Sequence, residues 1–316
     1  MYNGVTLPQA EAVAELATRL GGVVDPPIAG LPIERVCTPA DASGGAELLV
    51  LNSSRHLAAT LATGSPVLCS EKLATKVPAG RRWVHPHVMW AVAKLLSVEL
   101  ERRGRHPSAR VHPGAQLGED VEVHAGAVIA EGVRIGPHSL VSENAVLYPG
   151  VELGARVVVG PLAVVGRPGF GWARGPDGSL MRIPHRGGVV VGDDVEIGPL
   201  CTVDAGTLGP TRIEAGAKLD AHVHVGHNVV IGAGTMVAAQ AGFAGSAVVG
   251  ERALVGGQAG IADHAQIGAG ARIAAQSGVI GDIPPGETVA GFPAVSRDRF
   301  FRAMAHLLKL PDLERA

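Results

Sequence analysis

The chain has 316 residues, of which 47% are hydrophobic and only 3% aromatic, and its formal net charge is −2. This near-neutral balance argues against binding to nucleic acid through a basic surface. The three cysteines form no CxxC pair, which favours a reduced protein of the cytoplasm. No apolar run approaches the roughly 18 residues of a membrane span, and we expect neither a membrane helix nor a signal peptide.

Residues 1–105 are expected to form a small α/β domain. Apolar spacing and turn residues predict, in chain order, a helix that ends at Gly21-Gly22, β-like segments at Glu47–Leu51 and Pro66–Cys69, and a helix from Val88 to about Arg103. A basic linker follows this domain and indicates either a solvated joint or a contact to an acidic partner.

Through most of residues 106–295 an apolar, mainly branched aliphatic residue recurs every six positions. The repeat runs from Val111 to Val165, from Val191 to Val203 and from Ile213 to Val279. An α-helix repeats after 3.6 residues and a strand after two, whereas six residues match one face of a triangular parallel β-helix. The 25 hexads therefore predict a mainly β fold, a left-handed parallel β-helix of about eight coils and roughly 40 Å in height. Its narrow interior explains the scarcity of aromatic residues.

Two segments depart from the repeat. Residues 167–188 interrupt it and carry Phe170 and Trp172, so we expect a loop that projects from one corner, either to serve function or to brace a neighbouring subunit. Residues 296–316 predict a C-terminal helix with an apolar side. Its cations Arg297, Arg299 and Arg302 form either a solvated face or a docking site for an acidic partner.

Position in the repeat identifies the candidate catalytic residues. His227 falls at a corner or faces outward, because Val225 and Val229 on either side of it point inward. Gly245 follows 18 residues later, one coil above, and His264 follows 37 residues after His227, about 10 Å along the axis. An imidazole at this place suits a general base for an amine that attacks a thioester, and a glycine N–H suits the oxyanion.

A metal centre is an alternative interpretation of the histidines. His222 and His227 have HxxxxH spacing, and three histidines from two subunits hold zinc in β-helical carbonic anhydrases. The residue 37 positions before His222 is His185, which lies in the irregular loop where the register is lost. We therefore favour a site without a metal and without a cofactor.

Several motifs resemble one family, the UDP-3-O-(3-hydroxyacyl)glucosamine N-acyltransferases of lipid A biosynthesis, and the likeness covers nearly the whole chain. The motifs are Gly169-Phe-Gly-Trp-Ala173, Ile183-Pro-His-Arg-Gly187, Val195-Glu-Ile-Gly198, Asp204-Ala-Gly206, Lys218-Leu-Asp220, Gly226-His-Asn-Val-Val-Ile-Gly232 and Ala262-Asp-His264.

This resemblance implies a homotrimer with active sites between subunits, a uridine-binding N-terminal domain, and a 3-hydroxyacyl group on the phosphopantetheine of acyl carrier protein as donor. It makes His227 the general base, gives the N–H of Gly245 to the oxyanion, and places His264 at the phosphate of the nucleotide sugar. Expected substrate contacts are Asn52, Leu49, Arg55, Asp220, Asn228, Phe170 and Trp172, and the three C-terminal arginines would dock the carrier protein.

Two departures from the family pattern concern the site. The family stacks uracil between two aromatic residues, and the aligned segment Leu49–Arg55 keeps Asn52 but has no aromatic ring. The family usually has arginine where Ala205 stands. Alternatives to the N-acyltransferase are therefore an acetyl-CoA-dependent N-acetyltransferase of amino sugars, a zinc hydratase and a non-catalytic trimeric scaffold. Acyl length and the exact sugar are not encoded in any motif.

Overall fold

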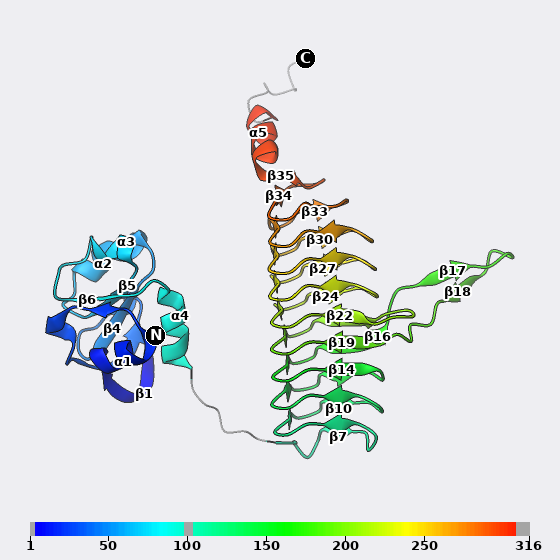
Figure 1. Ribbon diagram of the computed structural model, residues 1–316, viewed down its shortest axis with the longest axis horizontal. Coiled ribbons are helices and arrows are strands. Elements are labelled where there is room, and N and C mark those ends of the chain that lie inside the picture. Colours follow the sequence, from blue (N-terminus) through cyan, green and yellow to red (C-terminus); the bar gives the residue numbers. More distant parts are fainter. Residues whose placement is uncertain (1–3, 98–103, 308–316) are drawn as a thin grey trace. The chain divides into compact units, whose positions relative to one another are not determined.

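The computed structural model describes residues 4–97 and 104–307 (Figure 1). The chain folds as two compact units, Met1–Glu101 and Arg102–Ala316. This division falls four residues before the boundary expected from the end of the repeat. None of the described helices is long and apolar enough to cross a membrane.

The first unit is an α/β domain, and its described residues 4–97 form a six-stranded sheet with the strand order β1-β3-β4-β5-β6-β2. Strands β3 to β6 are parallel, and β1 and β2 pair antiparallel at the two edges. Its elements are β1 (Val5–Ala12), α1 (Val13–Leu20), β2 (Val23–Val24), β3 (Pro32–Cys37), β4 (Glu47–Leu51), α2 (Leu57–Leu61), β5 (Val67–Cys69), α3 (Glu71–Ala74), β6 (Arg82–Val84) and α4 (Val88–Leu96).

Apolar side chains pack on both faces of this sheet, one cluster around Leu16 and Trp83 and the other around Leu49 and Cys69. Helix α4 ends at Leu96 because Ser97 adopts an extended backbone, and the rest of the helix expected to reach about Arg103 lies outside the described residues.

The second unit is a left-handed parallel β-helix, as the six-residue period predicts. Its three faces are sheet 1, sheet 2 and sheet 3, which have nine, eight and ten strands within residues 104–307. Sheet 1 comprises β7 (Arg110–Val111), β10 (Val128–Ile129), β13 (Val146–Leu147), β16 (Val164–Pro168), β21 (Thr202–Ala205), β24 (His224–Val225), β27 (Gly242–Phe243), β30 (Gly260–Ile261) and β33 (Gly278–Val279). Sheet 2 comprises β8 (Gln116–Leu117), β11 (Arg134–Ile135), β14 (Val151–Leu153), β19 (Val189–Val191), β22 (Thr211–Ile213), β25 (Val230–Ile231), β28 (Val248–Val249) and β31 (Gln266–Ile267). Sheet 3 comprises β9 (Glu122–Val123), β12 (Leu140–Val141), β15 (Val158–Val159), β20 (Glu196–Ile197), β23 (Lys218–Leu219), β26 (Met236–Val237), β29 (Leu254–Val255), β32 (Arg272–Ile273), β34 (Thr288–Ala290) and β35 (Val295–Ser296).

The repeat residues fill the interior of this prism. Most hexads bury one large side chain and, four positions later, one small one, such as Val249 and Ala253, and Phe243 is an aromatic ring among them. The turns between the faces contain non-glycine residues in the left-handed conformation, 18 positions apart, as at Asn228, Ser246 and His264. Because each coil places its turn above the previous one, the side chains at each corner form a column.

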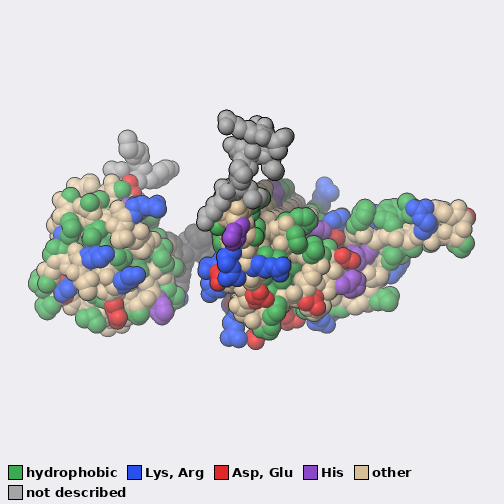
Figure 2. Space-filling view, turned by 90° about the horizontal axis from the view of Figure 1, so that it is seen from above, with side chains coloured by type: hydrophobic (Ala, Val, Ile, Leu, Met, Phe, Trp, Pro, Cys, Tyr) green, Lys and Arg blue, Asp and Glu red, His purple; other side chains and the backbone are tan. Residues whose placement is uncertain are grey.

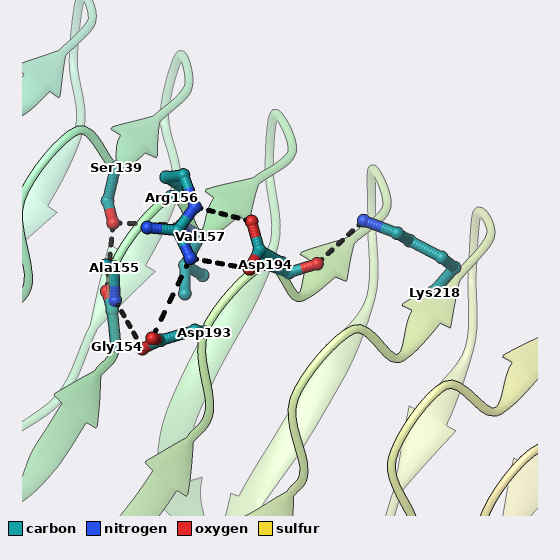
Figure 3. Close-up of polar contacts among 8 residues, drawn as sticks. All are labelled: Ser139, Gly154, Ala155, Arg156, Val157, Asp193, Asp194 and Lys218. Atoms are coloured by element: carbon teal, nitrogen blue, oxygen red, sulfur yellow. Dashed lines mark hydrogen bonds and ion pairs between the residues drawn. The ribbon is translucent and has the colours of Figure 1, made fainter.

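One such column ties the coils together across the interruption of the repeat (Figure 3). Arg156, before the interruption, donates from Nε and an Nη to the two carboxylate oxygens of Asp194, at 2.6 Å each. Nζ of Lys218 donates to the carbonyl oxygen of Asp194 at 2.7 Å, and the N–H of Ala155 donates to Asp193. The coils on either side of the loop are therefore held in register, although 38 residues separate Arg156 from Asp194.

The interruption itself forms an arm. The chain leaves sheet 1 after Pro168, makes an antiparallel hairpin of β17 (Trp172–Arg174) and β18 (Leu180–Arg182), and re-enters sheet 2 at Val189. Figure 1 shows the hairpin extending away from the prism, and hydrophobic side chains lie along it in Figure 2. At the far end of the chain α5 (Arg297–Leu307) follows β35, and the last part of the expected helix 296–316 lies outside the described residues.

Candidate active site

His227 lies at the corner between sheet 1 and sheet 2, directly after β24. The neighbouring Asn228 has a φ of 62° and anchors this turn. Its backbone N–H donates to Oγ1 of Thr211 at 2.8 Å, and its side-chain oxygen accepts from Thr207 N and Oγ1 at 3.0 and 2.9 Å. The same oxygen is 3.3 Å from Nδ1 of His227. Asn228, expected to contact substrate, therefore orients the imidazole and fixes the adjacent loop.

Gly245 and His264 stack above His227, as the 18-residue coil predicts. The N–H of Ser246 donates to the carbonyl of His227 at 2.9 Å, and the N–H of His264 donates to the carbonyl of Gly245 at 3.1 Å. A Cβ at Gly245 would lie 2.5 Å from Cε1 of His227, so the glycine allows the ring to rest against the next coil. Among the described residues the N–H of Gly245 donates no backbone hydrogen bond.

The arm returns a second imidazole to this corner. The rings of His185 and His227 have centroids 4.8 Å apart and a tilt of 49°. His185 is only 9% exposed. Burial, followed by the proximity of His227, lowers the pKa of His185. Gly169 lies against both rings, since a Cβ there would be 3.0 Å from Cβ of His227 and 3.2 Å from Nε2 of His185.

A buried carboxyl group completes the cluster. Asp204 on β21 is 1% exposed. Its Oδ1 forms an ion pair with Nε of Arg167 at 3.0 Å, without the alignment of a hydrogen bond. Its Oδ2 lies 3.9 Å from Nε2 of His224, whose Nδ1 is 2.7 Å from Oγ1 of Thr202. Burial raises the pKa of Asp204, while Arg167 and the imidazoles of His224, His227 and His185 oppose this change.

Comparisons with known proteins bear on the family. The model of the bacterial transferase hexapeptide (six repeats) matches residues 210–245. The UDP-3-O-acylglucosamine N-acyltransferase 2 of Legionella pneumophila is 51% identical over 144 residues, 46% of this chain and 42% of that protein. The UDP-3-O-acylglucosamine N-acyltransferase of Coxiella burnetii is 34% identical over 267 residues, which cover 78% of this chain and 76% of that protein. The chain belongs to the UDP-3-O-acylglucosamine N-acyltransferase family.

Solved structures agree on the architecture. The UDP-N-acetylglucosamine acyltransferase of Campylobacter jejuni superimposes with a TM-score of 0.56 at 29% identity, over 66% of this chain and 86% of that one. LpxA of Acinetobacter baumannii gives a TM-score of 0.57 at 21% identity, over 66% and 78% of the chains, and shows the fold alone. The chain is therefore an acyltransferase of the hexapeptide-repeat superfamily with an LpxA-like β-helix.

The N-terminal unit of this acyltransferase contains the residues expected to contact the nucleotide. A pocket of about 570 Å³ is lined by Asn52, His56 and Met89, among others. Arg55 is exposed and does not line the pocket. The expectation for Leu49 is wrong, since its side chain is fully buried in the core. Strand β4 is covered on both faces, so its apolar run did not reveal which residue points toward the pocket.

Three further predicted substrate contacts are exposed in the structure. Asp220 is exposed at the corner between sheet 3 and sheet 1 and accepts from the N–H of Ala221 at 2.7 Å. Phe170, in the segment before the hairpin, is 83% exposed, and Trp172 stacks under the guanidinium of Arg182 at 5.3 Å.

The histidines weighed as a metal site do not converge. His222 lies at the corner between sheet 3 and sheet 1, whereas His185 and His227 meet at the next corner. No group of three His, Cys, Asp or Glu side chains among the described residues is placed to hold a metal ion.

Sequence reasoning missed the roles of His185, Asp204 and Arg167. Ala205 stands where the family usually has arginine, but Arg167 on the adjacent strand β16 supplies a positive charge here and pairs with Asp204 in the parallel register. The sequence pattern could have revealed the Arg167–Asp204 pair. Arg167 and Asp204 lie just after the inward residues Val165 and Val203, on neighbouring strands of sheet 1.

Proposed function

We propose that this enzyme transfers a 3-hydroxyacyl group from acyl carrier protein to the 2-amino group of a UDP-linked 3-O-acylglucosamine, in lipid A synthesis. Membership of the family supports the reaction and the acceptor. The contact between His227 and Gly245 carries the proposal, because it places an imidazole and an unused backbone N–H side by side at an accessible corner.

The chemistry follows from these two groups. The amine nitrogen attacks the thioester carbonyl, His227 accepts the proton that the nitrogen loses, and the carbonyl oxygen becomes an oxyanion. The N–H of Gly245 donates to this oxyanion. When the tetrahedral intermediate collapses, the carbon–sulfur bond breaks, and His227 returns its proton to the leaving thiolate. His264, two coils above His227 and exposed, binds the phosphate of the nucleotide. No metal or cofactor is needed for these steps.

We assign carrier-protein docking to α5. Its cations Arg297, Arg299 and Arg302 are all exposed, and Figure 2 shows basic side chains gathered at this end of the prism. A negatively charged carrier domain suits this surface, because complementary charge accelerates and orients association. The three cysteines are unpaired and buried, which supports the cytoplasm as the place of the reaction.

A homotrimer is part of this proposal. Phe170 and Met181 near the two ends of the arm are 83% and 74% exposed, and the corner residues Leu162 and Leu200 are exposed as well. Exposed apolar groups of this size mark surfaces that bind a partner. Light scattering should give a mass three times that of the 32.2 kDa chain. A monomer with full activity would contradict this part.

The proposed donor is tested by competition. The purified enzyme is given UDP-3-O-(3-hydroxymyristoyl)glucosamine with equal amounts of acetyl-CoA and of acyl carrier proteins with 3-hydroxyacyl chains of several lengths, and the products are identified by mass. We expect an amide with a long 3-hydroxyacyl chain. An acetylated product would favour the acetyl-CoA-dependent alternative. If no product forms, the remaining interpretation is a non-catalytic scaffold.

A further inference from the structure

The ring nitrogen Nδ1 of His185 is buried and has no hydrogen-bond partner among the described residues. The residue is 9% exposed, and its ring faces that of His227 at 4.8 Å between centroids. Buried polar atoms in native proteins almost always have a partner, and leaving one unpaired costs free energy. The unpaired nitrogen therefore marks a position beside the general base where a hydrogen-bonding group is expected.

The surroundings of His185 hold its ring in place. A Cβ at Gly171 would lie 2.8 Å from Cε1 and 3.2 Å from Nε2 of this ring, and a Cβ at Gly169 would lie 3.2 Å from Nε2. The loop backbone at these two glycines thus packs against the Cε1–Nε2 edge of the ring. A ring enclosed in this way keeps the direction of its Nδ1, so this nitrogen is organised before a ligand arrives.

The charge state of His185 limits the chemistry of its partner. Burial and the proximity of His227 lower its pKa, the backbone of Ile183 and the carboxyl group of Asp204 act in the opposite sense, and Arg182 lowers it further. A neutral imidazole has one donor and one acceptor nitrogen. A hydroxyl group pairs with Nδ1 in either tautomer, because a hydroxyl both donates and accepts. A phosphate oxygen only accepts and an ammonium group only donates, so each fits one tautomer alone.

We propose that His185 binds a hydroxyl group of the acceptor sugar and holds the adjacent amine against His227. This inference rests on the proposed function, which supplies the sugar. His185 is then a substrate-binding residue that the arm delivers to the corner. The arm leaves and re-enters the prism at the level of His227, and its returning segment Ile183–His185 brings the His185 imidazole to that corner.

The test compares His185→Ala and His185→Gln with wild type, with His222→Gln as the matched control. His222 is an exposed histidine at a different corner of the prism. The dissociation constant of UDP-3-O-(3-hydroxymyristoyl)glucosamine is measured by calorimetry, and KM is measured for both substrates. We expect His185→Ala to raise the Kd and KM of the sugar about 5- to 20-fold. The KM of the acyl donor should change less than twofold.

His185→Gln should recover most of this affinity, because an amide also donates and accepts. The loss of sugar affinity in His185→Ala should be similar at pH 7.5 and pH 8.5, because burial lowers the pKa of this imidazole and favours its neutral form. An unchanged sugar Kd in His185→Ala, with or without a lower melting temperature, would show that Nδ1 binds no substrate and would overturn the inference. If wild type neither binds nor acylates this sugar, the proposed function fails and the inference falls with it.

Discussion

Replacing Gly245 by alanine adds one methyl group against the ring of His227. The new Cβ would lie 2.5 Å from Cε1 and 2.7 Å from Nε2 of that ring, about 1 Å closer than carbon atoms normally approach. The backbone of Gly245 is not in the left-handed region, so alanine itself introduces no strain there. The imidazole is half-buried, whereas the coil is held by its backbone ladder, so we expect the ring, rather than the coil, to yield.

The size of the effect follows from what the ring does. A positioned general base contributes on the order of 10²–10⁴ in rate, and a ring displaced by about 1 Å loses much of that contribution. We therefore expect Gly245→Ala to lower kcat about 100-fold, while the KM of each substrate changes little. The melting temperature should stay within about 2 °C of wild type, because little buried apolar surface is lost.

Gly257→Ala is the matched control. Gly257 also precedes a left-handed corner residue, Gln258, but a Cβ there would meet no ring: it would lie 3.3 Å from the carbonyl oxygen of Ala239 and 4.0 Å from Cβ of Ala238. Its kcat should remain within threefold of wild type. Steady-state rates of amide formation at saturating donor decide the comparison. A Gly245→Ala enzyme with more than half the wild-type kcat would refute the claim that His227 must stay pressed against this coil.

Three further predictions concern charge and packing. Arg167→Ala should lower the free energy of unfolding by about 1–3 kcal/mol in chemical denaturation, because it leaves the carboxyl group of Asp204 buried without its cation; an unchanged denaturation midpoint would show that the ion pair contributes nothing. The Arg82 guanidinium and two backbone N–H groups lower the pKa of Asp25 from about 3.8 to about 2. The folded pKa lies below the unfolded one, so the stability that Asp25 contributes is complete above about pH 4 and is lost as the pH falls towards 2. Asp25→Asn should flatten this part of the pH dependence in thermal unfolding, and an identical profile would contradict the assignment. Phe243→Ala should cost about 3–5 kcal/mol by opening a cavity in the prism, whereas Phe243→Leu should cost much less; equal losses would argue against a cavity effect.

The β-helix was predictable because its information is periodic. Every hexad has the same pattern of inward and outward residues, so the repeat from Val111 onward predicts the three sheets. The length of one coil, 18 residues, then places Gly245 over His227. The same arithmetic predicts that His264 belongs to this column. The positions of these residues can be predicted without knowing how side chains pack, because they follow from counting along a regular backbone.

The remainder of the site depends on irregular backbone. His185 reaches His227 only because the arm returns to the corner, and no period fixes where a loop of about 20 residues ends. The Arg167–Asp204 pair depends on the register between two strands on either side of that loop. Leu49 was misplaced because β4 is apolar on both faces, and such a strand does not show which side borders a pocket.

The measurement that bears most directly on the account is the initial rate of amide formation by wild type and His227→Ala. Both are assayed with UDP-3-O-(3-hydroxymyristoyl)glucosamine and 3-hydroxyacyl-acyl carrier protein. The account predicts a ready reaction with wild type and a rate at least 100-fold lower with a fully folded His227→Ala protein. A variant that keeps more than a tenth of the wild-type rate would contradict it.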